Sequence, residues 1–167
     1  SDCYLPRLGG IEVQVAELAG IQAAAGHPVH VVTATPAHAP DTDNGGAPLL
    51  HRVVAPLPFE LPVHPRAARA LAHVLDGVAP DVVHVHEPFT PSTSMLATLA
   101  ATTPVVATFH AFLDRSRLME VSGPILRQID RRIDAAVAVS EAAASFVRRV
   151  RHGPVEIVPN GVDVARF

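Results

Sequence analysis

The sequence predicts an α/β fold with a parallel, doubly wound sheet that carries helices on both faces. Short apolar runs alternate with segments of helical periodicity along most of the chain, an order typical of such sheets. The runs at residues 105–107 and 136–139 are apolar at every position, as expected of strands that are buried on both faces. The chain has 167 residues, of which 49% are hydrophobic, which is enough for one domain with a substantial core.

The first helix is predicted over residues 10–25, where apolar side chains recur every three or four positions and form one stripe. Gly26 is expected to end this helix, because glycine accepts the left-handed conformation that follows many helices. A loop rich in Pro, Asp and Gly follows at residues 36–48. The helical stripe consists of Ile11, Val15, Leu18, Ile21 and Ala25.

The remaining elements follow from the same periodicities. A hydroxyl at Ser92 and another at Ser140 stand at helix starts, where they satisfy free backbone N–H groups, and Glu141 complements the dipole of its helix. The strand at 52–55 is expected at the sheet edge, because prolines follow it. Strands are predicted at residues 29–34, 52–55, 81–86, 104–109, 135–139 and 155–158. Helices are predicted at residues 65–76, 92–101, 125–134 and 140–151.

The first strand of the sheet is missing from the sequence. In a doubly wound sheet this strand is central, and the Gly-rich turn follows it directly. Residues 1–6 read as the end of a strand and the turn. We therefore expect about five to seven apolar residues before Ser1, the length of a typical strand. Either the sequence is truncated, or a neighbouring chain fills the position.

Composition narrows the classes of function. The net charge is −3, which argues against nucleic acid as a partner. Cys3 is the single cysteine, so neither a disulfide framework nor a cysteine-based zinc site is expected. No apolar run approaches the roughly 18 residues of a membrane span, and no signal-peptide pattern opens the chain. We expect a cytoplasmic protein.

Gly9 and Gly10 directly precede the first predicted helix. A helix N-terminus has free N–H groups and a partial positive charge, so it attracts phosphate, and glycine lets the ligand approach the backbone closely. The same pair is also compatible with a turn that serves chain geometry alone. The dinucleotide fingerprint G-x-G-x-x-G is absent, which argues against an NAD enzyme.

His110 follows the strand predicted at residues 104–109, at the edge of the sheet where open α/β folds bind ligands. An imidazole there can hydrogen-bond a substrate, or it can cap a neighbouring carbonyl. His84 and His86 share one strand face, so together with His110 they offer a second hypothesis, a metal site of three imidazoles. That site would make the protein a metallohydrolase.

Five short stretches follow one another along the chain: LGGIE at residues 8–12, VHEP at 85–88, ATFH at 107–110, AVSE at 138–141 and VPNGVD at 158–163. In this order they resemble the N-terminal Rossmann-like domain of retaining GT-B glycosyltransferases of family 4. Within that family the sequence is similar to bacterial phosphatidylinositol mannosyltransferases. The resemblance covers nearly the whole chain.

The resemblance implies one half of a GT-B enzyme. Residues 1–158 would be the acceptor-side domain and residues 159–167 the start of the interdomain hinge, while the C-terminal Rossmann-like domain would be missing. The implied reaction moves a hexose such as mannose, with retention, from a nucleotide-sugar (GDP-mannose or a UDP-sugar) to a lipid or glycan acceptor. No metal and no other cofactor is implied, and the fragment alone is expected to be inactive.

The resemblance also assigns residues to the site. Gly9 and Gly10 would hold the donor diphosphate, and His110 would be the catalytic residue that contacts the transferred sugar. Glu12 stands where the resembling mannosyltransferases carry Gln, which leaves its role less defined. Three side chains would line the acceptor side of the cleft: Glu12, His86 and Glu87.

Two other readings of the chain stay open beside the transferase. One is the metallohydrolase built on His84, His86 and His110, and the other is a non-catalytic nucleotide-binding or interaction module. A peripheral contact with the inner face of the cell membrane is also open. The helix predicted at residues 65–76 carries only a few basic residues, Arg66 and Arg69. This number favours a solvated helix face over a membrane-binding patch.

Overall fold

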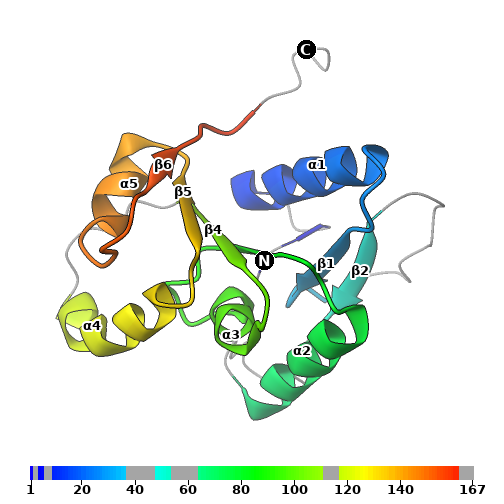
Figure 1. Ribbon diagram of the computed structural model, residues 1–167, viewed down its shortest axis with the longest axis horizontal. Coiled ribbons are helices and arrows are strands. Elements are labelled where there is room, and N and C mark those ends of the chain that lie inside the picture. Colours follow the sequence, from blue (N-terminus) through cyan, green and yellow to red (C-terminus); the bar gives the residue numbers. More distant parts are fainter. Residues whose placement is uncertain (2–3, 6–8, 37–47, 54–63, 111–116, 162–167) are drawn as a thin grey trace.

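The computed structural model describes residues 1, 4–5, 9–36, 48–53, 64–110 and 117–161. Strands and helices alternate in these residues, as the sequence predicts (Figure 1). The helices are α1 (Gly10–Ala24), α2 (Pro65–Val78), α3 (Thr93–Ala100), α4 (Arg117–Asp130) and α5 (Glu141–Val147). The strands are β1 (His30–Thr33), β2 (Leu49–Arg52), β3 (Val83–His86), β4 (Val105–Phe109), β5 (Ala135–Ala138) and β6 (Glu156–Ile157).

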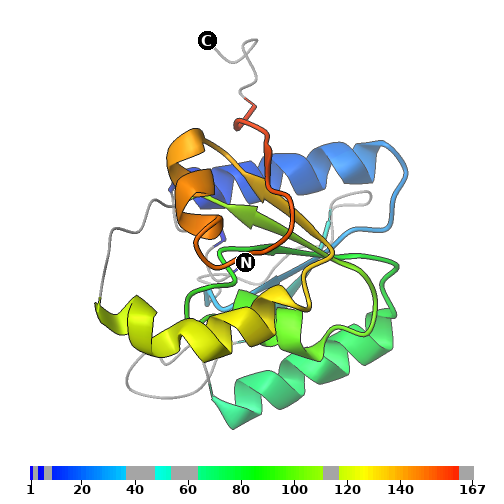
Figure 2. The same cartoon turned by 60° about the vertical axis from the view of Figure 1, so that its left-hand side comes forward.

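All pairs between these strands are parallel, which confirms the predicted fold class. The strands β3, β4, β5 and β6 form one sheet in that order, and β1 pairs with β2 in a second sheet. One face is covered by α1 and α5 and the other by α2, α3 and α4, on which the two views agree (Figures 1 and 2). The structure is therefore doubly wound, but its sheet is divided between β1 and β3.

The main hydrophobic core surrounds β4. The side chains of Val105, Ala107 and Phe109 on this strand are fully buried, as expected of a central parallel strand. The ring of Phe89 packs on Phe109 with centroids 4.9 Å apart and on Phe146 with centroids 6.5 Å apart. These three rings hold β4, the segment after β3 and α5 together.

A second, smaller core lies under α1, and it shows that the predicted inner face of this helix is partly wrong. Glu12, Val15 and Ala19 are buried, whereas Ile21 is 68% exposed. The helix carries apolar residues all round, so periodicity alone did not fix which face turns inwards. Val15 and Ala19 form a cluster with Val31 of β1 that is separate from the main core.

The predicted signals at the helix ends are confirmed. The hydroxyl oxygen of Ser92 accepts the N–H of Met95 at 2.9 Å, and that of Ser140 accepts the N–H of Ala143 at 3.2 Å. Each hydroxyl satisfies one backbone donor of the first helical turn. Gly26 follows α1 with a φ of +92°, a conformation that favours glycine.

The strand β2 lies at the outer edge of the divided sheet, as predicted for a strand that prolines follow. Its bounds are Leu49–Arg52 and not residues 52–55, of which 54 and 55 lie outside the described residues. It pairs with β1 so that Leu49 stands opposite His30. Most of the predicted loop at residues 36–48 also lies outside the described residues.

The prediction for α4 is wrong, because the helix spans Arg117–Asp130 and not residues 125–134. Pro124 lies inside it, although a proline in a helix interior costs about 3 kcal/mol. Burial of Leu126 and Ile129 in the main core contributes about 1.5–3 kcal/mol for each side chain. Burial of these two side chains therefore offsets the cost of the proline. The sequence pattern reflects only that local cost, which is why it predicts a later helix start.

The helix α5 ends at Val147, four residues before its predicted end, and the chain then turns so that Arg151 points inwards. The guanidinium donates to the Asp130 carboxylate at 2.8 Å, to the carbonyl of Ile133 at 3.2 Å and to the carbonyl of Pro154 at 3.1 Å. The two charged side chains are only 5% and 10% exposed. This buried ion pair ties the end of α4 to the segment between α5 and β6.

Replacing Asp130 with Ala would leave the Arg151 guanidinium buried without its carboxylate. We expect this variant to lose about 3–5 kcal/mol in free energy of unfolding, measured by urea denaturation. Asp130→Leu combined with Arg151→Met, which removes both charges, should lose clearly less. A double variant as unstable as Asp130→Ala would contradict this explanation. Glu141→Ala, which breaks an exposed ion pair with Arg148, serves as the control and should cost at most about 1 kcal/mol.

Candidate functional site

The carboxyl ends of β3 and β4 bring together four residues that the sequence analysis named as candidates. They are His84, His86, Glu87 and His110. In the parallel register of these strands, His86 stands opposite Thr108. Glu87 therefore follows β3 beside the point where His110 follows β4. This is the edge at which open α/β sheets bind ligands.

Glu87 holds this edge through its backbone and its side chain. Its N–H donates to the carbonyl of Thr108 at 3.0 Å, its carboxylate accepts the N–H of His110, and its carbonyl accepts the hydroxyl of Thr90 at 3.0 Å. Its φ is +56°, a left-handed conformation that costs a non-glycine residue about 1–2 kcal/mol. The hydrogen bonds hold the strained turn and fix the backbone position of His110.

The three imidazoles of the site form a stack. The Nδ1 atom of His86 lies 2.9 Å from the Nε2 atom of His110, and the two ring centroids are 5.2 Å apart. On its other side the ring of His86 stacks on that of His84 at 4.6 Å. The Nε2 atom of His84 is hydrogen-bonded to the hydroxyl of Thr108 at 2.8 Å. His86 is only 7% exposed, so it lies beneath His110 as part of a packed layer.

Burial keeps these imidazoles neutral, because water no longer solvates the charged form. It lowers the pKa of His84 to about 4 and that of His86 to about 2, and it also lowers the pKa of His110. A neutral imidazole has one donor and one acceptor nitrogen. The Nδ1 atom of His110 is buried and has no hydrogen-bond partner among the described residues.

The metal hypothesis finds no geometric support. Within the described ranges, no group of three or more His, Cys, Asp or Glu side chains is arranged to hold a metal ion. His84 and His86 instead bond to Thr108 and His110, and their rings stack face to face. Cys3 lies outside the described residues.

A second group of predicted residues lies at the start of α1. Gly9 is the N-cap with extended backbone, and none of the described side chains caps the helix there. Glu12 is buried and folds back over Gly9, where an added Cβ would lie 2.9 Å from its Cδ atom. A Cβ at Gly10 would meet no described atom within 4 Å. The backbone of this turn is therefore open at Gly10 and covered by a carboxylate at Gly9.

Topology places the segment before this turn and the histidine stack at the same edge of the sheet, where the carboxyl ends of the strands lie. The N–H of Tyr4 donates to the hydroxyl of Thr35, which follows β1, at 3.0 Å. The segment that leads to α1 thus starts at the carboxyl end of β1, and His110 lies at the carboxyl end of β4. The hydrogen bonds given above join His84, His86, Glu87 and His110, while Gly9, Gly10 and Glu12 form a separate group.

The sequence analysis missed one residue of the site. Thr108 bonds His84 through its hydroxyl and Glu87 through its carbonyl. The available signal was a lone hydroxyl within an otherwise apolar strand, two residues before His110. The sequence analysis places Thr108 in the strand predicted at residues 104–109 and assigns it no function.

Residues 8–166 match the family described as Glycosyltransferase Family 4. The chain belongs to glycosyltransferase family 4. The match spans both the turn before α1 and the histidine stack, so both groups of candidate residues lie within the matched residues. Among the described residues of this domain, no helix combines the length and apolar character that crossing a membrane requires.

The family 4 domain is also similar to curated mannosyltransferases. It is 36% identical over 165 residues to the phosphatidyl-myo-inositol mannosyltransferase of Mycolicibacterium smegmatis, a match that covers 95% of the chain and 42% of that relative. The enzyme of Mycobacterium tuberculosis is 36% identical, in a match that covers 95% of the chain and 43% of that relative. The enzyme of Mycobacterium leprae is 34% identical, in a match that covers 93% of the chain and 42% of that relative. The chain thus spans about two fifths of the length of these relatives.

The buried imidazoles predict that acid destabilises the domain. Unfolded histidines take up protons near pH 6.5, whereas folded His84 and His86 do so only near pH 4 and 2. Below about pH 6.5 the unfolded state binds more protons, so the free energy of unfolding should fall as pH falls. Each group adds a slope of up to about 1.4 kcal/mol per pH unit until its folded pKa is reached.

Urea denaturation between pH 7.5 and 4.5 measures this slope. His84→Gln should reduce it by up to half, whereas His73→Gln, at an exposed position on α2, should leave it nearly unchanged. An identical slope in the His84 variant and the unsubstituted chain would rule out this origin of the acid sensitivity.

Proposed function

We propose that the chain is the acceptor-side domain, at residues 1–158, of a retaining GT-B glycosyltransferase. The observation that carries the proposal is the family match over residues 8–166, together with 36% identity to enzymes named phosphatidyl-myo-inositol mannosyltransferase. The proposed reaction moves a hexose, mannose by this likeness, from GDP-mannose or a UDP-sugar to a lipid or glycan acceptor. Residues 159–167 would begin the hinge to a second Rossmann-like domain, and 162–167 lie outside the described residues.

His110 is the proposed catalytic residue. Glycosyl transfer develops positive charge on the sugar ring at the anomeric carbon. A neutral imidazole can hydrogen-bond the transferred sugar without adding a repelling charge, and burial lowers the pKa of His110. Its ring is braced by His86 and its backbone N–H by Glu87. Such preorganised hydrogen bonds stabilise a transition state at little cost of reorganisation.

Gly9 and Gly10 are the proposed seat of the donor diphosphate. The open backbone at Gly10 and the partial positive charge of the α1 N-terminus support this role. On the acceptor side of the cleft we place Glu12, His86 and Glu87. The bonds of His86 and Glu87 to His110 give these two residues an additional role in positioning the catalytic ring.

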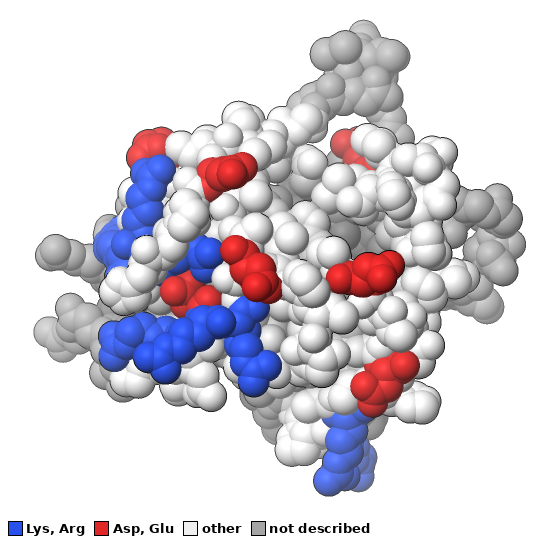
Figure 3. All heavy atoms as spheres, in the orientation of Figure 1, with Lys and Arg blue, Asp and Glu red and all other residues white. Residues whose placement is uncertain are grey.

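The acceptor determines where the enzyme works. A lipid acceptor would bring it to the inner face of the cell membrane from the cytoplasm, as a peripheral protein. Exposed arginines gather over α4 and α5 at the left of the molecule (Figure 3), where they would meet anionic headgroups. They are Arg127, Arg131, Arg132, Arg148 and Arg149.

The function is tested with the whole protein that the gene encodes. It should transfer hexose from a GDP- or UDP-sugar with retention, which proton NMR of the anomeric position detects. Residues 1–167 alone should give no turnover, because the cleft of such an enzyme needs both domains. Robust transfer by the isolated chain would contradict the two-domain proposal. Stoichiometric zinc with hydrolytic activity would favour a metallohydrolase, and nucleotide binding without transfer would favour a binding module.

His110→Ala in the whole enzyme should lower kcat far more than it weakens nucleotide binding. One hydrogen bond to a developing charge is worth roughly 2–4 kcal/mol, which corresponds to about 30- to 1000-fold in rate. Steady-state kinetics and calorimetric binding of the nucleoside diphosphate measure the two effects. His73→Ala, on the exposed face of α2, is the control. Unchanged kcat in the His110 variant would remove this residue from the active site.

Gly10→Val should weaken binding of nucleoside diphosphate and leave nucleoside binding nearly unchanged, because the new side chain would stand where the diphosphate approaches. The structure offers a matched control at Gly20 in the same helix, where an added Cβ also meets no described atom within 4 Å. Both variants should have similar melting temperatures, since each places one valine in α1. Equal loss of both ligands in the Gly10 variant, or no loss, would mean that this glycine serves the turn alone.

A further inference from the structure

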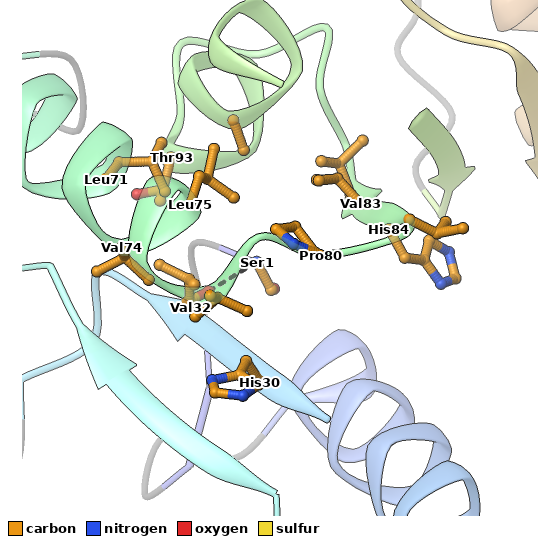
Figure 4. A pocket seen from close by; sticks show the side chains of 14 residues that line it. Ser1, His30, Val32, Leu71, Val74, Leu75, Pro80, Val83, His84 and Thr93 are labelled. Atoms are coloured by element: carbon orange, nitrogen blue, oxygen red, sulfur yellow. Dashed lines mark hydrogen bonds between the residues drawn. The ribbon is translucent and has the colours of Figure 1, made fainter. Parts of the chain in front are cut away.

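The segment that leads to α1 is held beside the end of β1 by hydrogen bonds. The nitrogen of Ser1 donates to the carbonyl of Val32 at 3.0 Å (Figure 4). The N–H of Tyr4 donates to the hydroxyl oxygen of Thr35, which follows β1, at 3.0 Å. Two positions of this segment are therefore attached near the carboxyl end of β1, shortly before the turn that opens α1.

Arg52 adds two bonds at the same place. It is the last residue of β2 and stands opposite Thr33 in the parallel pair with β1. Its Nη1 atom donates to the carbonyl of Thr35 at 2.7 Å, and its Nη2 atom donates to the carbonyl of Leu5 at 3.1 Å. One side chain thus joins three segments of the chain, which are the end of β2, the residues after β1 and the segment before α1.

A guanidinium is well suited to this bridge. Its N–H donors are spread over a rigid planar fork, so two of its nitrogens can bond two separate carbonyls in fixed directions. Bonds from such a charged donor are roughly twice as strong as bonds between neutral groups. Lysine would keep the charge but has a single nitrogen, and glutamine has a single amide nitrogen and no charge. Neither replacement of Arg52 reproduces the fork.

Thr35 connects these bonds to the sheet. Its N–H donates to the hydroxyl oxygen of Thr33 at 3.1 Å, its carbonyl accepts Arg52 and its hydroxyl accepts Tyr4. Thr33 is fully buried in β1, so Thr35 has a firm attachment on one side. Loss of the Arg52 fork would release Leu5 directly and would loosen Tyr4 through Thr35.

The turn at Gly9 and Gly10 lies between two attached positions. On one side stand Tyr4 and Leu5 with the bonds given above, and on the other side Ile11 packs against the small core, as Tyr4 also does. The two glycines have no side chains of their own with which to hold the turn. Its order therefore depends on the flanking residues, and a loop that is ordered beforehand binds a ligand at a lower cost in entropy.

We propose that Arg52 is a positioning residue for the turn at Gly9 and Gly10. Its fork holds the preceding segment against the end of β1, so that the backbone N–H groups at the start of α1 are ordered before a diphosphate binds. Arg52 acts through the backbone and not by contact with the ligand. The inference rests on the proposed donor site at these two glycines.

Amide hydrogen exchange in the whole protein, without ligand, tests whether Arg52 holds the segment. In Arg52→Lys and Arg52→Gln, the amide of Tyr4 should exchange about tenfold faster or more, because its bonded state opens more easily. The amide of Val53, which bonds the carbonyl of Thr33 at 2.8 Å, should keep its rate. Arg69→Gln, at an exposed position on α2, is the control and should change neither rate.

Two outcomes of this exchange experiment would overturn the proposal. An unchanged rate at Tyr4 in both Arg52 variants would show that the fork does not hold the segment. Equal loss of protection at Tyr4 and Val53 would show that Arg52 supports the β1–β2 pair as a whole.

Calorimetric binding and steady-state kinetics of the whole protein test the link to the ligand. In both Arg52 variants the Kd of nucleoside diphosphate should rise about threefold to tenfold, because the turn must then be ordered on binding, and nucleoside binding should stay unchanged. The KM for the nucleotide-sugar should rise with kcat nearly unchanged, since the ordering cost is the same in the ground state and the transition state.

The lysine variant separates positioning from charge. Unsubstituted affinity in Arg52→Lys together with weakened binding in Arg52→Gln would mean that the positive charge alone attracts the ligand, and would overturn the positioning role. Absence of nucleoside diphosphate binding in the unsubstituted protein would instead overturn the proposed function. Exchange at Tyr4 needs no ligand, so it still decides in that case whether Arg52 holds the segment.

Discussion

The parallel pairing of β3 with β4 is the constraint on which the candidate site depends. It sets His86 opposite Thr108, so the turn after one strand and the loop after the next begin at the same level. The three phenyl rings of Phe89, Phe109 and Phe146 pack directly beneath this edge. Because the strands cannot slip without exposing that core, the positions of the polar groups above it are fixed.

This edge combines several groups that are individually unfavourable. Glu87 has a left-handed backbone, and two imidazoles lie in a layer that strongly disfavours their charged forms. Locally unfavourable residues persist where the surroundings over-determine them, and they gather at functional sites. The paired hydrogen bonds of Glu87 and His86 are the surroundings that hold His110 in place.

Local signals predicted much of the fold. The hydroxyls of Ser92 and Ser140, the glycine at position 26 and the apolar run of β4 all act within a few residues, so a single sequence is enough to recognise them. The features that could not be predicted depend on distant partners. Pro124 remains inside α4 because of core packing, and Arg151 turns inwards because Asp130 lies at the end of another helix.

The site shows the same division between local and distant information. Sequence position alone placed His86, Glu87 and His110 at one edge of the sheet, since all follow or end neighbouring strands. Their mutual bonds could not be read from spacing, because Glu87 reaches the backbone of His110 from a residue 23 positions away. The division of the sheet, the two separate cores and the inward face of α1 also depend on distant contacts and were not predicted.

The bond between His86 and His110 has a consequence for the polarity of the site. With both rings neutral, a single proton lies between Nδ1 of His86 and Nε2 of His110. If it belongs to His86, the buried Nδ1 of His110 must carry a hydrogen and offers a donor; if it belongs to His110, the same atom offers a lone pair. A group that bonds the remaining nitrogen of His86 would therefore select whether Nδ1 of His110 is a donor or an acceptor, through a tautomeric relay that involves no net charge.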